Sequence, residues 1–390
     1  MSRSEEAVRR EAVARRLSGE SPEAIGRSLG RPRQWVARWA RRYDPGDRDW
    51  AADRSRAPHT VANRTPGELV SQVLSVRERL EANPWAQIGA EAIAWELSKM
   101  GVPPPATRTI ERILSRAGKV RRRRERYEPK GTPYPTPPAA APGDLWQADI
   151  VGPRHLDGGM PFSALNAIDI APHAAAIEIV ADEREATFTG AVIALMGRLG
   201  VPRRLQLDNG KPFVLGGATL GEVVRIALHQ GATPVFIPQG EPWRNGVVEH
   251  FNDTFDQRFF RSERFIDRTQ LAERAAVFER FHNANHRYRA TGRRTPDELT
   301  ASARRQQPVP LAELPGGWPA EGKVEFIRFI RSDRKLRLLR RELTMPEHAV
   351  YRYLTATLDL AAPKAENNLT VCDCEGELMA KVRVAAPGGG

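Results

Sequence analysis

Short apolar runs alternate with helical patterns between residues 144 and 260, and this order limits the folds open to the chain. Three β-leaning runs come first, LWQADIV, ALNAIDI and AAAIEIV, separated by turn-like pieces. A helical pattern follows at 186–200, then the strand RRLQL, a second helix, the strand TPVFI and a long helix at 243–260. Three strands followed by alternating helices and strands predict a mixed α/β sheet.

Three acidic residues stand in distinctive settings within this region. Asp149 lies inside an apolar strand, Asp208 ends a strand before a turn, and Glu249 lies one turn into the long helix. Converging carboxylates repel one another unless cations lie between them, so the trio predicts a divalent-metal site that cuts and joins phosphodiesters. Each residue has an alternative interpretation. Asp149 could cap a loop, Asp208 could form an Asx-turn, and Glu249 could lie on a solvated helix face.

The charge of the chain is concentrated at its beginning. Residues 1–126 hold 27 Lys and Arg against 16 Asp and Glu, a net of +11, and the remainder holds 33 against 32, a net of +1. Residues 144–260 are acidic, with 9 basic and 14 acidic residues, a net of −5. A basic front and an acidic middle predict a DNA-gripping arm on a metal-holding core. An arginine-rich composition alone does not predict this division.

Length and composition bound the organisation. With 390 residues, the chain predicts three to five units. No run reaches the roughly 20 apolar residues of a membrane span, and the charged N-terminus lacks an apolar signal segment. Cys372 and Cys374 are the only cysteines, and their spacing does not make a zinc site. We therefore expect a cytoplasmic, nucleoid-associated protein with no membrane partner.

Two small helical units are predicted before the sheet domain. In residues 1–45, Ser21-Pro22 marks a helix start, Gly30 ends that helix, and RPRQWVARWARRY follows. This is a helix-turn-helix pattern, with Trp35 and Trp39 more suited to the core than to base contacts. Its DNA-facing candidates are Arg31, Arg33, Gln34 and Arg38.

Residues 67–127 predict a second helix-turn-helix unit after a linker at 46–66. Its third helix begins near Thr107 and ends at Gly118. The DNA-facing candidates are Thr107, Arg108, Thr109 and Arg112, followed by the basic block Arg121, Arg122, Arg123 and Arg124. A Pro-rich linker at 128–143 then leads to the sheet domain at 144–300, and we expect that domain to fold without residues 1–126.

The C-terminal part predicts short strands. After a linker at 301–322, residues 323–385 contain β-leaning runs at hairpin-like spacing, among them KVEFIRFIR and AVYRYLTATLDL. This pattern favours a small closed β-barrel that contacts DNA or a partner.

Residues 144–290 resemble the ribonuclease H-like integrase core of DDE transposases and retroviral integrases. The resemblance rests on WQADI, NAIDI, LDNGKPF and PQGEPWRNGVVEHFNDTF, where Pro242, Asn245, Gly246 and Glu249 match a P-x-x-N-G-x-x-E pattern. Helix-turn-helix units before the core and a barrel after it resemble bacterial insertion-sequence transposases in particular. The resemblance implies a multidomain fold, with all-α helix-turn-helix modules, an α/β core and a small β-barrel.

The resemblance also assigns roles to residues. Asp149, Asp208 and Glu249 would be the catalytic metal ligands, holding two Mg²⁺ ions for which Mn²⁺ can substitute. Asn209, Gly210, Lys211, Asn245 and Gly246 would support the site, and Trp243 and Arg244 would reach DNA. Trp243 is equally suited to packing. Asp169 is not expected to be a ligand. The partners implied are double-stranded DNA, as element ends and target, and further copies of this chain; a helper ATPase stays open.

The sequence departs from the family pattern in two places. The gap between Asp208 and Glu249 is 40 residues, where about 35 is usual, and VLGGATLGE accounts for the extra length. No His-His-Cys-Cys zinc module precedes the core. The resemblance therefore implies a DNA transposase that cleaves 3′ ends and transfers strands. A catalytically silent DNA-binding regulator and a ribonuclease H-type nuclease are the alternatives.

Overall fold

A computed structural model describes residues 4–53, 64–120, 131–182, 184–210, 213–215, 219–339, 341–362 and 367–384. The chain divides into two compact units, Met1–Pro66 and Gly67–Gly390, which we describe separately. Lys211 and Arg121 to Arg124 lie outside the described residues. Among the helices of the described ranges, none combines the length and the apolar character needed to cross a membrane.

The first unit consists of three short helices. They are α1 (Glu5–Leu17), α2 (Pro22–Leu29) and α3 (Arg33–Arg42). Ser21 caps α2 by accepting a hydrogen bond from the Ala24 amide, and Gly30 ends that helix in the left-handed conformation. Trp39 is buried, as its spacing from Trp35 predicts.

This helical unit continues beyond residue 45, the end expected from the sequence. Trp50 and Ala51 are buried against Trp39. The Arg9 guanidinium donates to the Ala51 carbonyl at 2.9 Å and pairs with Asp53 at 2.7 Å. The turn-rich composition of 44–53 hid this packing, because a segment without periodicity can still contribute single anchoring side chains.

The second unit begins with three helices, α4 (Gly67–Glu81), α5 (Ala90–Lys99) and α6 (Thr107–Arg116). Their core contains Val73, Ile93, Leu97 and Ile110, all fully buried. The connection between α4 and α5 docks on the sheet domain. Trp85 lies among the rings of Phe259, Phe278 and Phe281, with centroid distances of 5.6 to 6.3 Å.

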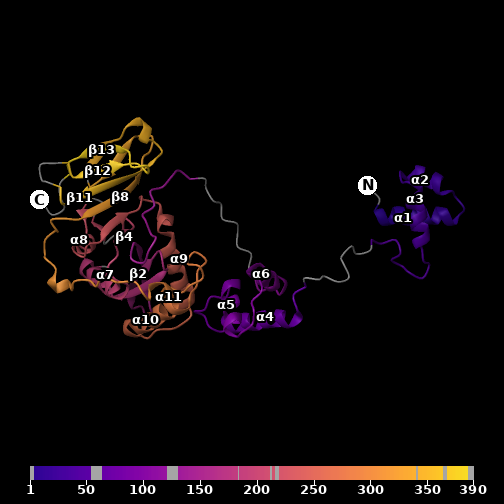
Figure 1. The fold of residues 1–390 in the computed structure, drawn as a ribbon, viewed down its shortest axis with the longest axis horizontal. Coiled ribbons are helices and arrows are strands. Elements are labelled where there is room, and N and C mark those ends of the chain that lie inside the picture. The colour runs from indigo at the N-terminus through magenta and orange to yellow at the C-terminus, as the bar shows by residue number, and fades with distance from the viewer. Residues whose placement is uncertain are drawn as a thin grey trace. The chain divides into compact units, whose positions relative to one another are not determined.

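A nine-stranded sheet forms the centre of this unit, with the order β13-β12-β11-β8-β7-β4-β1-β2-β3. Strands β1 (Leu145–His155), β2 (Pro161–Asp169) and β3 (Ala174–Val180) form an antiparallel meander. Strand β4 (Arg204–Leu207) pairs in parallel with β1, and β7 (Thr233–Phe236) pairs in parallel with β4. The mixed α/β sheet expected from the sequence is confirmed (Figure 1).

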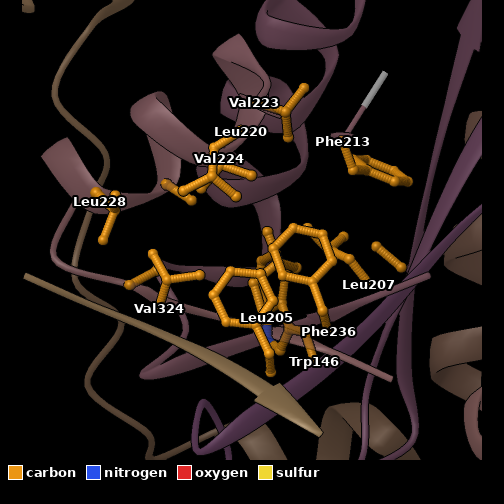
Figure 2. Close-up of a cluster of buried hydrophobic side chains, with 14 of the residues drawn as sticks. Trp146, Leu205, Leu207, Phe213, Leu220, Val223, Val224, Leu228, Phe236 and Val324 are labelled. Carbon is orange, nitrogen blue, oxygen red and sulfur yellow. The ribbon is translucent and has the colours of Figure 1, made fainter. Parts of the chain in front are cut away.

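Helices cover both faces of the sheet. One apolar cluster joins the sheet to α7 (Glu185–Leu199) and α8 (Glu222–His229), and Figure 2 shows Trp146, Leu205 and Phe236 within it. The other cluster joins the sheet to α9 (Gly246–Thr254) and α10 (Arg268–Asn285). Between β4 and α8 lies a small hairpin, β5 (Val214–Leu215) and β6 (Thr219–Leu220), within the segment expected to carry the extra length.

The long helix expected at 243–260 consists of three helical types. It starts as a 3₁₀ turn (Pro242–Asn245), continues as α9 and ends as a π-helix (Phe255–Phe260). The expected apolar stripe of Val248, Phe251, Phe255 and Phe259 is buried. After α10 come α11 (Pro296–Thr300) and a 3₁₀ turn (Leu311–Glu313).

The C-terminal strands do not pair as the expected closed barrel. Strands β8 (Lys323–Phe329), β11 (Tyr353–Asp359), β12 (Leu369–Cys372) and β13 (Leu378–Val382) extend the central sheet. A separate hairpin, β9 (Lys335–Leu338) and β10 (Arg341–Thr344), precedes a 3₁₀ turn (Glu347–Ala349). Hairpin spacing is the same in a barrel and an open sheet, so the sequence could not show that β8 pairs with β7.

Candidate active site

The structure brings the three predicted carboxylates to one region of the sheet. Asp149 lies in β1, Asp208 directly follows β4, and Glu249 lies in the first turn of α9. Strands β1 and β4 are neighbours, and α9 packs on β1 and β2. Because strand side chains alternate, Gln147 and Asp149 leave β1 on one face, and Gln147 contacts the start of α9.

Asp149 is held by two hydrogen bonds. Its carboxylate accepts from the Ile150 amide at 2.9 Å and from the Asn252 side chain at 2.8 Å. Burial and the nearby charges of Asp208 and Glu249 together raise the pKa of Asp149 to about 6, while these two hydrogen bonds oppose the shift. Asp149 does not cap a loop, which removes that alternative.

Asn252 belongs to a chain of side chains that sequence reasoning missed. Its amide oxygen accepts from Asn166 of β2 at 2.8 Å, so its nitrogen faces Asp149. Asn166 is fully buried and lies opposite Asp149 in the register of β1 and β2. Position 252 is three residues after Glu249, one helical turn, and this spacing is the signal that could have identified it.

Asp208 lies in a tight turn. The Gly210 amide donates to its carboxylate at 3.0 Å, which is the bond of the Asx-turn alternative. A methyl group at position 210 would lie 3.1 Å from both carboxylate oxygens, so glycine leaves room around Asp208. The turn and the interaction with Asp149 coexist, and the Asx-turn does not exclude a ligand role.

Glu249 is half-buried and has no hydrogen bond or ion pair with another described residue in this structure. Burial raises its pKa, and Asp253, one turn further along the helix, raises it too. Both causes disfavour the charged form, and a nearby cation would favour it. Because Glu249 is half-buried, its surroundings lie between the ligand role and the solvated helix face of the alternative interpretation.

Asn245 connects the start of α9 to the central strands. Its amide nitrogen donates to the Ala148 carbonyl at 3.2 Å, and its amide oxygen accepts from Gln206 of β4 at 2.9 Å. Gln147 caps α9 by accepting from the amides of Val247 and Val248. Gly246 has open space around its α-carbon, so sterics do not demand glycine there.

The two DNA candidates before α9 differ in their surroundings. Trp243 is 61 % exposed. Arg244 is occupied within the protein. It pairs with Glu241 at 3.0 Å, donates to the Tyr353 hydroxyl at 2.9 Å, and lies 3.8 Å from the ring centre of Tyr134. These contacts give Arg244 a structural role in joining the segment before β1 to β11.

The candidate DNA contacts in the two helical units also differ in their surroundings, because some are paired within the protein and others are exposed. Arg31 pairs with Glu5, and Arg33 pairs with Glu23 at 2.9 Å. Gln34 and Arg38 are exposed on α3, and Arg108 and Arg112 are exposed on α6. Thr107 and Thr109 are half-buried in the first turn of α6.

The described residues contain no ready-made metal cluster. No group of three or more Asp, Glu, His or Cys side chains within them is arranged to hold a metal ion. Asp149, Asp208 and Glu249 nevertheless offer oxygen donors of the kind that Mg²⁺ prefers. Burial, with the charges of Asp208 and Glu249, raises the pKa of Asp149. By chemistry and charge the donor set fits a divalent cation.

Comparisons with known proteins agree with this architecture. The integrase core domain family matches residues 230–296, which include Glu249, and a homeodomain-like domain family matches residues 3–49. An insertion element IS476 uncharacterized 39.2 kDa protein from Xanthomonas euvesicatoria is 26% identical over 194 residues. That match covers 48% of this chain and 53% of the relative, about half the length of each.

Solved structures with some similarity include two retroviral proteins. The HTLV-2 integrase catalytic core domain in complex with magnesium is 14% identical, with a TM-score of 0.33 over 42% of this chain and 99% of that one. A simian T-cell lymphotropic virus intasome in complex with a PP2A regulatory subunit is 13% identical, with a TM-score of 0.38 over 77% and 96%.

The mixed sheet and the helix α9 that covers it agree with the match of residues 230–296 to the integrase core domain family. The three helices of the first unit agree with the match of residues 3–49 to the homeodomain-like domain family.

Proposed function

We propose that this protein is a DNA transposase of the insertion-sequence type. It would bind the ends of its element, cleave their 3′ ends and transfer them into target DNA. The observation that carries the proposal is the placement of three carboxylates at one region of the sheet. Asp149 lies in β1, Asp208 directly follows the neighbouring strand β4, and Glu249 lies in α9, which packs on β1. The family matches to an integrase core and a homeodomain-like domain support it.

The three carboxylates would hold two Mg²⁺ ions, with Mn²⁺ as a substitute. Bound metal would activate the attacking oxygen and stabilise the leaving oxygen of the phosphodiester. The protein would hold Asp149 in its acceptor orientation through Asn252 and fix the start of the Glu249 helix through Gln147 and Asn245. Gly210 would leave Asp208 uncrowded.

DNA is the partner implied by the matched domains. Gln34 and Arg38 on α3, and Arg108 and Arg112 on α6, are exposed and would contact it, as would Trp243. Lys211 and Arg121 to Arg124 remain candidates on sequence grounds. Two element ends must be held together, so we propose a multimer on DNA. No feature of the described residues supports a helper ATPase, and the proposal does not include one.

A cleavage assay tests the proposal. The substrate is a duplex with the inverted repeats that flank the reading frame, and the reaction contains Mg²⁺ or Mn²⁺. We expect wild-type protein to nick and join this DNA, and Asp149→Asn to lose at least about 100-fold in rate. Asp169→Asn is the matched control, because Asp169 is a buried aspartate on the next strand.

The same assay separates the alternatives. Tight, specific DNA binding by the wild type without cleavage in either metal would indicate a silent regulator. Cleavage of RNA–DNA hybrid in preference to end DNA would indicate a ribonuclease H-type nuclease. An Asp149→Asn variant as active as the wild type would refute the assignment of the site.

A further inference from the structure

The side chain of Asn209 holds the turn that carries Asp208 in place through hydrogen bonds. The Asn209 side chain does not join the carboxylates, because its nitrogen donates to the Ile237 carbonyl just after β7 at 2.6 Å. Its oxygen accepts a hydrogen bond from the Arg328 guanidinium at 2.9 Å. Both polar atoms of the amide are thus used to hold the backbone of the turn.

Arg328 reaches this turn from the C-terminal strands, 119 residues further along the chain. It lies in β8 and also donates to the carbonyls of Ile237 and Ile327, at 3.1 and 2.8 Å. It forms no ion pair with another described residue in this structure. Arg328 is half-buried, and this burial lowers its pKa to about 10.

The register of the sheet explains how Arg328 arrives there. Strand β8 runs parallel to β7, with Val235 opposite Glu325 and Phe236 opposite Phe326. The rings of Phe236 and Phe326 stack with centroids 5.2 Å apart. Two residues beyond Phe326, Arg328 therefore lies beside the end of β7, next to the end of β4 where Asp208 begins its turn.

Burying a guanidinium without a carboxylate partner costs stability, and here the hydrogen bonds to Asn209 and two carbonyls offset that cost. An apolar side chain at this position could stabilise the sheet equally well through packing. The hydrogen bond to Asn209 is the contact that connects the Arg328 guanidinium to the Asp208 turn.

We propose that Arg328 is a positioning residue of the active site, which holds the Asp208 turn through Asn209 and makes the C-terminal strands part of the metal-binding scaffold. This inference rests on the proposed function, because the turn matters through the ligand role of Asp208. The sequence predicted that the C-terminal region contacts DNA or a partner. The present proposal adds a second role, the support of the active site.

The test compares Arg328→Met, Asn209→Ala and the double variant with the wild type. Methionine replaces the apolar stem of Arg328 with an unbranched apolar side chain that cannot donate to Asn209. We expect each single variant to lose about tenfold in Mn²⁺ affinity, measured by electron paramagnetic resonance, which is the effect typical of removing the support of a metal ligand. The Mg²⁺ concentration for half-maximal cleavage should rise equally, with the KM for end DNA unchanged.

Two further variants make the comparison specific. Arg331→Ala removes an exposed arginine three residues away and should leave Mn²⁺ affinity unchanged. Arg328→Lys keeps the positive charge and a donating group, but not the planar guanidinium, and should recover part of the affinity. If Arg328→Met does not fold, Asn209→Ala carries the test, because it removes the same contact without touching the C-terminal strands.

The double variant decides whether the two residues act as a unit. We expect its loss to be close to the larger of the two single losses, because both substitutions remove the hydrogen bond between Arg328 and Asn209. Single variants within about twofold of wild-type Mn²⁺ affinity, or losses that multiply in the double variant, would overturn the proposal.

Amide hydrogen exchange separates this proposal from the proposed function. The Gly210 amide donates to Asp208 within the turn, and we expect it to exchange faster in Arg328→Met than in the wild type. If the wild type neither binds Mn²⁺ nor cuts DNA, the proposed function fails. If the Gly210 amide exchanges at the wild-type rate in Arg328→Met, Arg328 does not hold the Asp208 turn, and this conclusion does not depend on whether the protein cleaves DNA.

Discussion

At the scale of single residues, the strand period and the helical turn explain the neighbours of Asp149. Gln147 and Asp149 face α9 because they are two apart in β1, and Asn252 meets Asp149 because it lies one turn after Glu249. The sequence predicts the three carboxylates because each lies in a recognisable pattern, and their role as a site stays a prediction. Arg328 could not, because its partner Asn209 is 119 residues away and no local pattern joins them.

Gly210 is predicted to be required for space beside Asp208. Gly210→Ala would place a methyl group 3.1 Å from both carboxylate oxygens. Because that contact would displace the carboxylate, we expect metal-dependent cleavage to fall at least about tenfold, with a thermal midpoint close to that of the wild type. Gly197→Ala on α7, where nothing lies within 4 Å, is the control and should stay fully active. Equal activity of both variants would contradict the crowding argument.

Asp169 is predicted to make stability depend on pH. Burial raises its pKa to about 7, against the opposing hydrogen bond from the Gly143 amide. Because the pKa is raised, the folded state keeps a proton that the unfolded chain loses above about pH 4. The free energy of unfolding therefore falls as the pH rises from about 4 toward 7. Asn imitates the protonated form and can still accept from Gly143.

We therefore expect Asp169→Asn to have the same melting temperature as the wild type at pH 4. At pH 8 we expect its melting temperature to be a few degrees higher than that of the wild type, measured by calorimetry. A variant that melts below the wild type at pH 8 would show that Asp169 is stabilised as an anion.

At the scale of elements, the sequence predicted strands and helices better than their pairing. Local periodicity identified β1 to β4, α7 to α10 and the buried stripe of α9. It could not show that β8 pairs with β7, because register between distant strands is set by long-range contacts. It also missed the π-helix Phe255–Phe260, whose apolar spacing matches an ordinary helix closely.

Trp85 is predicted to anchor the α4–α5 connection on the sheet domain. Its ring contacts Phe259, Phe278 and Phe281, and the Arg274 guanidinium lies 4.9 Å from its centre. Trp85→Ala should lower the free energy of unfolding by about 3 kcal/mol in a denaturant titration, because it leaves a cavity among these rings. Trp243→Ala, at an exposed tryptophan, should change it by less than about 0.5 kcal/mol. Equal effects would argue against docking.

At the scale of the whole molecule, the basic front and acidic core predict DNA affinity that falls steeply with salt. The domain plan from sequence placed a removable DNA-binding arm at 1–126. The structure divides this arm differently, because residues 67–120 pack with the core and belong to the same compact unit. Composition could not reveal this docking, since individual side-chain contacts carry it, such as Trp85 among the phenylalanine rings, Arg287 over the Trp95 ring and the Arg293–Glu91 ion pair.

Two truncations test this division. Removal of residues 1–63 should leave a folded protein with weaker binding to end DNA and a shallower salt dependence, measured by fluorescence anisotropy. Removal of residues 1–130 should expose Phe259, Phe278 and Phe281 and give an unstable, aggregating protein, judged by calorimetry and light scattering. A stable, monodisperse protein after the longer truncation would show that the core folds without α4 to α6.

The location of bound Mn²⁺ in crystals of this protein with its end DNA tests the central claim most directly. Anomalous scattering identifies Mn²⁺ without reference to activity. The account predicts anomalous peaks between Asp149, Asp208 and Glu249, with all three carboxylates as ligands. Peaks elsewhere, or a DNA complex that cleaves in the crystal while these carboxylates bind no metal, would contradict it.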